Sequence, residues 1–167
     1  VGSFDADTSS SASKPKIEYP DEAFFKGVWA EIVETAERHN DPGKFSAFSG
    51  YEWTSMIDGD NMHRVVIFRD GAEKTLGAIP VSSTENNDPE YLWERLEDYE
   101  KKTGGEVLAI PHNSNLSEGR MYSRERVSGA AFDTQYANTR IRWEPVLEMT
   151  QVKGDSEAHP LISPNDP

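Results

Sequence analysis

The amino-acid sequence predicts an α/β fold with a mainly parallel sheet. The main indication is a helical pattern over residues 89–102 that leads into the apolar run 106–111, which together form half of a β-α-β crossover. A short, continuous apolar run of this kind is typical of a strand that is buried on both faces. The expected order of elements, helix, strand, strand, helix, strand, loop and strand, favours the same class. With 167 residues, the chain is long enough for one domain with its own core.

Residues 1–20 form a polar, Ser-rich lead-in, and the folded domain is expected over residues 21–167. Asp21 opens the first predicted helix. One apolar face recurs at helical spacing along this helix and is made by Phe24, Phe25, Val28, Trp29, Ile32, Val33 and Ala36. The pattern ends in the turn-forming stretch 39–43, which contains Asn, Pro and Gly.

Two strands are predicted next, over residues 45–53 and 63–69. The segment between them has the composition of a turn, with Asp58, Gly59 and Asp60 in succession. The two predicted strands could therefore run side by side as an antiparallel hairpin or take separate places in a parallel sheet.

The second predicted helix has clear start and stop signals. Asp88 followed by Pro89 is typical of a helix N-terminus, and Gly104 is typical of a C-terminus. The inner stripe of this helix consists of Leu92, Leu96 and Tyr99.

The last third of the chain is less regular. Residues 113–140 are polar and predict a long loop with a short helix, and loops of this length are often functional. A final strand is predicted over residues 143–152, and the three prolines of the remaining tail indicate irregular structure.

The composition excludes several classes of function. A net charge of −13 repels a nucleic-acid backbone, and no basic patch offsets it. No apolar run is long enough to span a membrane, and no signal peptide is present. Because the chain has no cysteine, disulfides and cysteine-based zinc sites are excluded.

Two residues that can bind metal lie at predicted strand ends. Glu52 closes one strand, and His112 directly follows the apolar run 106–111. In parallel α/β folds the carboxyl ends of the strands carry the reactive groups, and imidazole and carboxylate are ligands for divalent ions. The pattern therefore indicates metal-assisted hydrolysis. The alternative is that each side chain serves only local structure by hydrogen bonding to its neighbours.

Three more residues are candidate metal ligands or supporting groups. His63 lies near Glu52 if the strands 45–53 and 63–69 form an antiparallel hairpin, and otherwise lies on the opposite edge. Glu148 is a charged residue within the predicted strand 143–152, where it needs a partner, solvent or a metal. His159 has acidic neighbours that could orient it.

Several cations occur late in this acidic chain and could bind an anionic substrate such as a phosphate. The alternative is ordinary pairing with the many surface carboxylates. They are Arg120, Arg124, Arg140, Arg142 and Lys153.

Several blocks of the sequence resemble the Domain of Unknown Function 3604 family. They include FSGYEWTS (48–55), GDNMHRVVIFRDGA (59–72) and longer blocks over 88–121 and 136–160, and the resemblance covers residues 21–167. That family is similar to the PHP (polymerase and histidinol phosphatase) superfamily of metal-dependent, phosphoesterase-like hydrolases. The resemblance implies that the chain forms part of a distorted PHP-like β/α barrel with mainly parallel strands.

The same resemblance implies roles for individual residues. Glu52, in GYEW, matches the bridging-carboxylate motif of the superfamily, and His112, in AIPHN, matches a later ligand histidine. The implied cofactors are divalent metal ions, either zinc, manganese or iron, and the implied substrate is a small anionic ester. Members of the family resemble exported bacterial proteins, which favours a periplasmic or extracellular location.

The opening H-x-H motif and the closing D-x-H motif of the superfamily do not occur in this sequence. The chain is therefore expected to be an internal piece of a metal-dependent hydrolase, inactive alone, with part of a site that uses metal-activated water. Self-association or the missing flanks would cover its open sheet edges. The alternative function is a non-catalytic α/β domain that binds a ligand or partner through residues 113–140.

Overall fold

The computed structural model describes residues 21–152, 154, 155 and 161. Its helices are α1 (Glu22–His39), α2 (Ala72–Thr75), α3 (Pro89–Thr103), the short 3-10 helix η1 (Arg120–Tyr122) and α4 (Thr134–Trp143). Its strands are β1 (Gly50–Trp53), β2 (Met56–Ile57), β3 (Asp60–Asn61), β4 (Arg64–Phe68), β5 (Val107–Pro111), β6 (Thr150–Gln151) and β7 (Gly154–Asp155). No helix in this described part is both long enough and apolar enough to cross a membrane.

The central sheet has three strands in the order β1-β4-β5. Both pairs are antiparallel: Glu52 lies opposite Val65, and Val65 lies opposite Ile110. The prediction of a mainly parallel sheet within a PHP-like β/α barrel is therefore wrong, since all the sheets of the described residues are antiparallel and none closes into a barrel.

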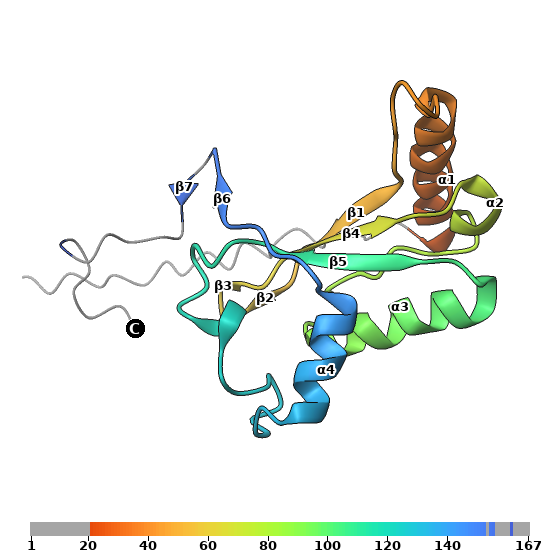
Figure 1. The fold of residues 1–167 in the computed structure, drawn as a ribbon. Helices are drawn as coiled ribbons and strands as arrows, with labels where there is room; N and C mark the ends of the chain where they lie inside the picture. The colour runs from red at the N-terminus through yellow and green to blue at the C-terminus, as the bar shows by residue number, and fades with distance from the viewer. Residues whose placement is uncertain (1–20, 153, 156–160, 162–167) are drawn as a thin grey trace, which may run out of the picture.

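The direction of β5 follows from the connection that precedes α3. After β4 and α2 the chain returns through an irregular segment, 76–88, to the end of the sheet where β4 began, and only then does α3 start (Figure 1). The helix runs forward along the sheet and β5 runs back, so β5 is antiparallel to β4. The helix and strand 89–111 thus look like half of a crossover in sequence, but the returning segment reverses their sense.

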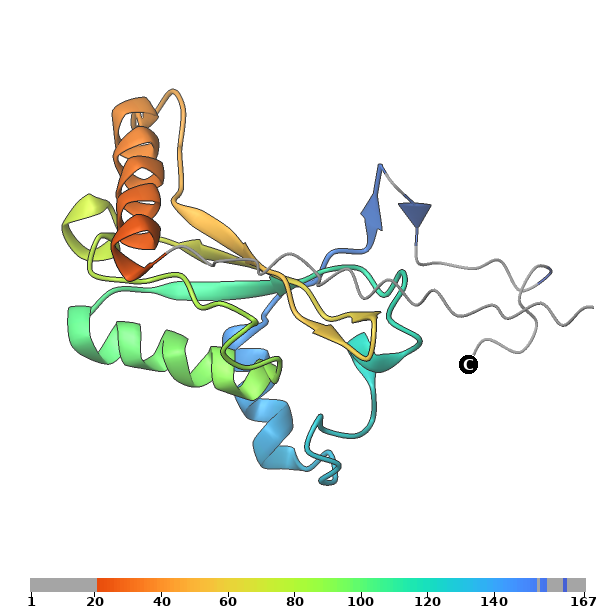
Figure 2. The same ribbon diagram turned by 180° about the vertical axis from the view of Figure 1, so that it is seen from behind.

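One face of the sheet is buried and the other is partly exposed. Val66 and Phe68 of β4 and Ala109 of β5 are buried together with the inner stripe of α3, whereas Val65 on the opposite face is exposed. The run 106–111 is therefore not buried on both faces, because its residues alternate between buried and half-buried. Both ribbon views show α3 and α4 on the same side of the sheet (Figures 1 and 2).

The helix ends form as their capping residues predict. The side chain of Asp21 accepts a hydrogen bond from the backbone N–H of Phe24, and Asp88 caps α3 in the same way through Glu90. Gly104 ends α3 with a φ of 63°, a left-handed conformation that suits glycine.

The apolar face predicted for the first helix is only partly buried. Trp29 and Val33 enter the core, but the remaining large apolar side chains of that face are exposed: Phe24, Phe25, Val28 and Ile32. They line one wall of an open groove of about 750 Å³ whose other walls include Tyr51, Ile79 and Val81.

The prediction of a strand over residues 143–152 is also wrong for most of that range. Residue 143 ends α4, residues 144–149 are irregular, and only Thr150–Gln151 pair as β6. The N-cap of α4 is Asp133, whose side chain accepts a hydrogen bond from the backbone N–H of Tyr136 (2.7 Å). Asp133 is a recognisable N-cap within the stretch 113–140, which was predicted to be a long loop with a short helix.

The carboxylate of Asp70 ties α2, α3 and β5 together. It accepts hydrogen bonds from Lys74 Nζ (2.9 Å), Tyr99 Oη (3.2 Å) and the backbone N–H of Glu106 (2.6 Å). Burial raises the pKa of Asp70, but these hydrogen bonds outweigh burial and hold the pKa below its ordinary value.

Replacing Asp70 with asparagine is expected to lower the free energy of unfolding by about 2–3 kcal/mol at neutral pH, because hydrogen bonds to a charged acceptor are lost. A lowered folded-state pKa gives stability that is present above the ordinary pKa and is lost as the pH falls through the folded value. Urea unfolding between neutral and acid pH measures both effects. Asp98→Asn, at an exposed ion pair, is the control, and equal acid sensitivity of the D70N variant and the wild type would contradict this account.

Candidate functional site

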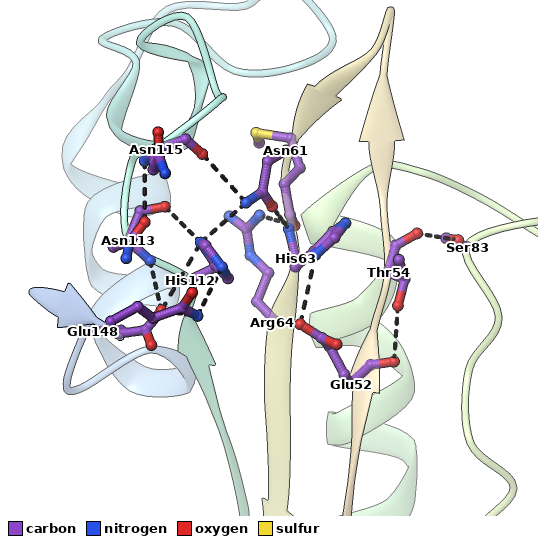
Figure 3. A network of polar contacts seen from close by, with 12 residues as sticks. Glu52, Thr54, Asn61, His63, Arg64, Ser83, His112, Asn113, Asn115 and Glu148 are labelled. Atoms are coloured by element: carbon purple, nitrogen blue, oxygen red, sulfur yellow. Dashed lines mark hydrogen bonds and ion pairs between the residues drawn. The ribbon is translucent and has the colours of Figure 1, made fainter. Parts of the chain in front are cut away.

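Four of the five predicted site residues lie at one edge of the sheet (Figure 3). We call Glu52, His63, His112 and Glu148 the histidine rim. Glu52 belongs to β1, His63 precedes β4, and His112 follows β5. Because neighbouring strands are antiparallel, the carboxyl ends of β1 and β5 meet the amino end of β4, which brings the three residues together. His159 lies outside the described residues.

The hairpin alternative for His63 is the one found. Its Nδ1 lies 3.5 Å from Glu52 Oε1, and its backbone N–H donates to Asn61 Oδ1 (2.9 Å). The carbonyl oxygen of His63 accepts from the backbone N–H of His112 (3.0 Å), and the two imidazole rings meet edge to face with centroids 5.9 Å apart. Backbone pairing therefore fixes the spacing of the two histidines.

His112 is 9% exposed, and each of its ring nitrogens has a partner. The side-chain nitrogen of Gln151 lies 2.8 Å from Nε2. Nδ1 lies 2.8 Å from the carbonyl oxygen of Asn113. Asn61 Nδ2, 3.0 Å from Nδ1, donates to the carbonyl oxygen of Asn115 (3.3 Å).

Tyr122 supports the main chain at His112. Burial raises the pKa of Tyr122 above its ordinary value, so its hydroxyl stays protonated. That hydroxyl donates to the carbonyl oxygen of His112 (3.3 Å). The turn after β5 is thereby held from the side of η1.

Glu148 reaches the rim from the irregular segment after α4, not from a strand. Its backbone N–H donates to the carbonyl oxygen of Pro111 (3.1 Å), and its Oε2 accepts from the backbone N–H of Asn113 (3.0 Å). The same oxygen accepts from Gln151 Nε2 (3.0 Å) and lies 3.9 Å from His112 Nδ1. Glu148 is thus anchored alongside the end of β5.

A buried network of charged side chains lies next to the rim and was not predicted from the sequence. Arg64 Nε donates to Glu144 Oε1 (3.1 Å), and both side chains are 1% exposed. Trp93 Nε1 donates to the same oxygen (3.0 Å), and Arg140 Nε donates to Glu144 Oε2 (3.1 Å). The alternation of β4 contains the signal, since Arg64 shares the buried face of Val66 and therefore needs a buried partner.

The cations considered for anion binding are paired where the structure shows their contacts. Arg140 contacts Glu144, Arg142 Nη2 lies 2.5 Å from Glu100 Oε2, and Arg120 contacts Asp58 and Asp60. Lys153 is outside the described residues. The pairs of Arg120 and Arg142 match the alternative of ordinary pairing with surface carboxylates, whereas Arg140 belongs to the buried network of Glu144.

The rim supplies suitable donor types for a divalent ion but not a complete set. Imidazole and carboxylate groups suit zinc, manganese and iron. The carboxylate of Glu52 faces His63, and that of Glu148 faces the backbone of Asn113. Accordingly, the described residues contain no group of three or more His, Cys, Asp or Glu side chains placed to hold a metal ion.

Comparison with known proteins gives one match, to a family. No curated protein matches the chain, and no solved structure does so. The sequence model of the family described as "Protein of unknown function (DUF3604)" matches residues 3–167, nearly the whole chain. The chain therefore belongs to the DUF3604 family.

Proposed function

We propose that the chain is part of a metal-dependent hydrolase and that the histidine rim contributes protein ligands for a divalent ion. The observation that supports this most directly is the meeting of two imidazoles and two carboxylates from separate segments, with the imidazole rings 5.9 Å apart. The substrate class proposed is a small anionic ester. The sequence blocks around Glu52 and His112 also support a relationship to the PHP superfamily at the level of motifs, without its parallel barrel.

In this proposal each histidine presents a nitrogen oriented by a neighbour. The carbonyl oxygen of Asn113 lies 2.8 Å from His112 Nδ1, and the proposal assigns the ring proton to Nδ1 and the coordinating lone pair to Nε2. Glu52 faces Nδ1 of His63 and orients that ring. Hydrogen bonds of this kind fix the tautomer and ring orientation of histidine ligands. When bound, the ion would activate water for hydrolysis as a Lewis acid.

The proposal predicts binding of zinc or manganese that depends on both rim histidines. His63→Ala and His112→Ala are each expected to weaken zinc binding by about 100-fold, because a ligand is lost from an already small set. Isothermal titration of the chain with zinc measures this loss. His39→Ala, at the exposed end of α1, is the matched control. Equal affinities in all four proteins would contradict the proposal, and hydrolysis of an aryl phosphate with added zinc or manganese tests the catalytic step.

The second candidate function is binding of a partner or ligand without catalysis. It is favoured by the groove of about 750 Å³ beside α1, which is lined by exposed apolar side chains including Phe24, Phe25 and Ile32. Exposed apolar side chains gathered in one groove are typical of a docking surface. Hydrolysis that depends on added metal and on His112 would exclude this function as the sole activity of the chain.

A further inference from the structure

An open pocket of about 440 Å³ is formed by residues of η1, of α4 and of the loop that joins them (Figure 1). Its lining residues are Tyr122, Ser123, Arg124, Phe132 and Arg140. They supply two guanidinium groups and two aromatic rings, and none of them is acidic. In a chain with a net charge of −13, this pocket is therefore a local site of positive charge.

The positive charge of Arg140 is only partly balanced inside the protein. Its Nε donates to Glu144 Oε2 (3.1 Å), but the other oxygen of the same carboxylate accepts from Arg64 Nε (3.1 Å). One carboxylate therefore serves two guanidinium groups. Arg140 Nη2 donates to the carbonyl oxygen of Met121 (2.8 Å), which carries no net charge. Because a guanidinium has more N–H donors than these contacts use, Arg140 can bind an anion without releasing Glu144.

Arg124 supplies the second positive charge, and two rings supply apolar walls. Arg124 is exposed, and no carboxylate among the described residues pairs with it. Tyr122 and Phe132 are each 40% exposed, so a ligand can reach both rings. The guanidinium carbon of Arg140 lies 5.5 Å from the centre of the Tyr122 ring, which holds a charge beside an aromatic face. Guanidinium groups bind carboxylate or phosphate oxygens, and aromatic side chains pack against a ligand ring.

We propose that this pocket binds a small aromatic anion. Arg124 and Arg140 bind its carboxylate or phosphate group, and Tyr122 and Phe132 pack against its ring. The pocket needs no metal ion, so it goes beyond the proposed function and does not rest on it. It adjoins the histidine rim, because the Tyr122 hydroxyl donates to the carbonyl oxygen of His112 (3.3 Å). A ligand in the pocket therefore contacts the side chain that supports the end of β5.

Isothermal titration of the whole chain with phenyl phosphate and with benzoate, in the presence of a metal chelator, tests the pocket. Both anions should bind, and Arg124→Ala should raise each Kd by about tenfold, because hydrogen bonds to a charged group are lost. Arg140→Met should weaken binding to a similar extent, and Glu144 keeps Arg64 as its partner in that variant. Arg38→Ala, at an exposed arginine of α1, is the matched control and should leave each Kd unchanged.

The contribution of the rings is measured with inorganic phosphate, which should bind several-fold more weakly than phenyl phosphate because it has no ring to pack on Tyr122 and Phe132. Equal affinities for these two ligands would overturn the aromatic part of the proposal. Tighter binding of either benzoate or phenyl phosphate would support the pocket and identify the acidic group that it prefers. No binding of either anion, or the same Kd in Arg124→Ala and the wild type, would overturn the site.

A second measurement locates the ligand without relying on affinity. Phenylglyoxal modifies accessible arginine side chains, and phenyl phosphate should slow the modification of Arg124 but not that of Arg38, as read by peptide mass spectrometry. Equal rates for Arg124 with and without phenyl phosphate would overturn the site even if the anion binds elsewhere on the chain. Zinc binding by the rim histidines is a separate measurement, so its failure would reject the proposed function and leave this pocket in place.

Discussion

Replacing Glu144 with alanine is expected to lower the free energy of unfolding by about 3–5 kcal/mol, because it leaves buried positive charge without its partner. Arg64 is 1% exposed and has Glu144 as its carboxylate partner. Its other hydrogen bond is to the carbonyl oxygen of Met62, and its guanidinium lies over the ring of Trp53. Neither contact supplies a negative charge. The substitution also removes the acceptor of Trp93 Nε1.

Urea denaturation of the wild type and of Glu144→Ala measures this loss. Glu97→Ala is the matched control, because Glu97 lies on α3 in an exposed ion pair with Lys101 and should contribute less than about 1 kcal/mol. A similar loss in both variants would mean that the buried network contributes no more than a surface pair. Zinc binding by the rim histidines should also weaken in Glu144→Ala, since Arg64 begins β4 and His63 directly precedes it.

Trp29→Ala is expected to lower the free energy of unfolding by about 3–5 kcal/mol and to release α1 from the sheet. Trp29 is 3% exposed, and its indole Nε1 donates to the carbonyl oxygen of Thr75 (3.0 Å). Its ring packs against Phe68 and Tyr51 with centroids 5.6 and 6.0 Å away. Apart from Val33, no other α1 side chain is buried, so Trp29 provides most of the docking of this helix.

Hydrogen exchange of the α1 amides and urea denaturation test this prediction together. Phe25→Ala on the same helix removes a large side chain that is already exposed, and it should cost less than about 1 kcal/mol. Protection of the α1 amides should fall in Trp29→Ala and persist in Phe25→Ala. If both variants retain protection, α1 is held by contacts other than the indole.

Local signals in the sequence predicted local structure well. Asp21, Asp88 and Gly104 occupy the cap positions that their chemistry favours, since a cap depends only on neighbouring backbone groups. Glu52 and His112 could be placed at strand ends because the residue pattern of a strand is also local. Whether His63 lies near them depended on whether β1 and β4 form a hairpin, which the turn composition allowed but did not require.

The direction of β5 and the pairing of Arg64 with Glu144 could not be read in the same way. The reversal depends on the irregular segment 76–88, which has no periodic pattern of its own. The partner of Arg64 lies 80 residues away, in a part of the chain where a strand was expected. Burial over such distances in sequence depends on the tertiary arrangement, which a local pattern does not contain.

The antiparallel pairing of β1 with β4 also sets an order of folding. These strands are close in sequence, and closing the segment between them costs little chain entropy, whereas β5 joins only after α2, the irregular segment 76–88 and α3. The hairpin that places Glu52 beside His63 is therefore expected to form early, and His112 to arrive when β5 docks. Half of the histidine rim can exist in a folding intermediate, but the half that holds His112 and Glu148 is a property of the completed sheet.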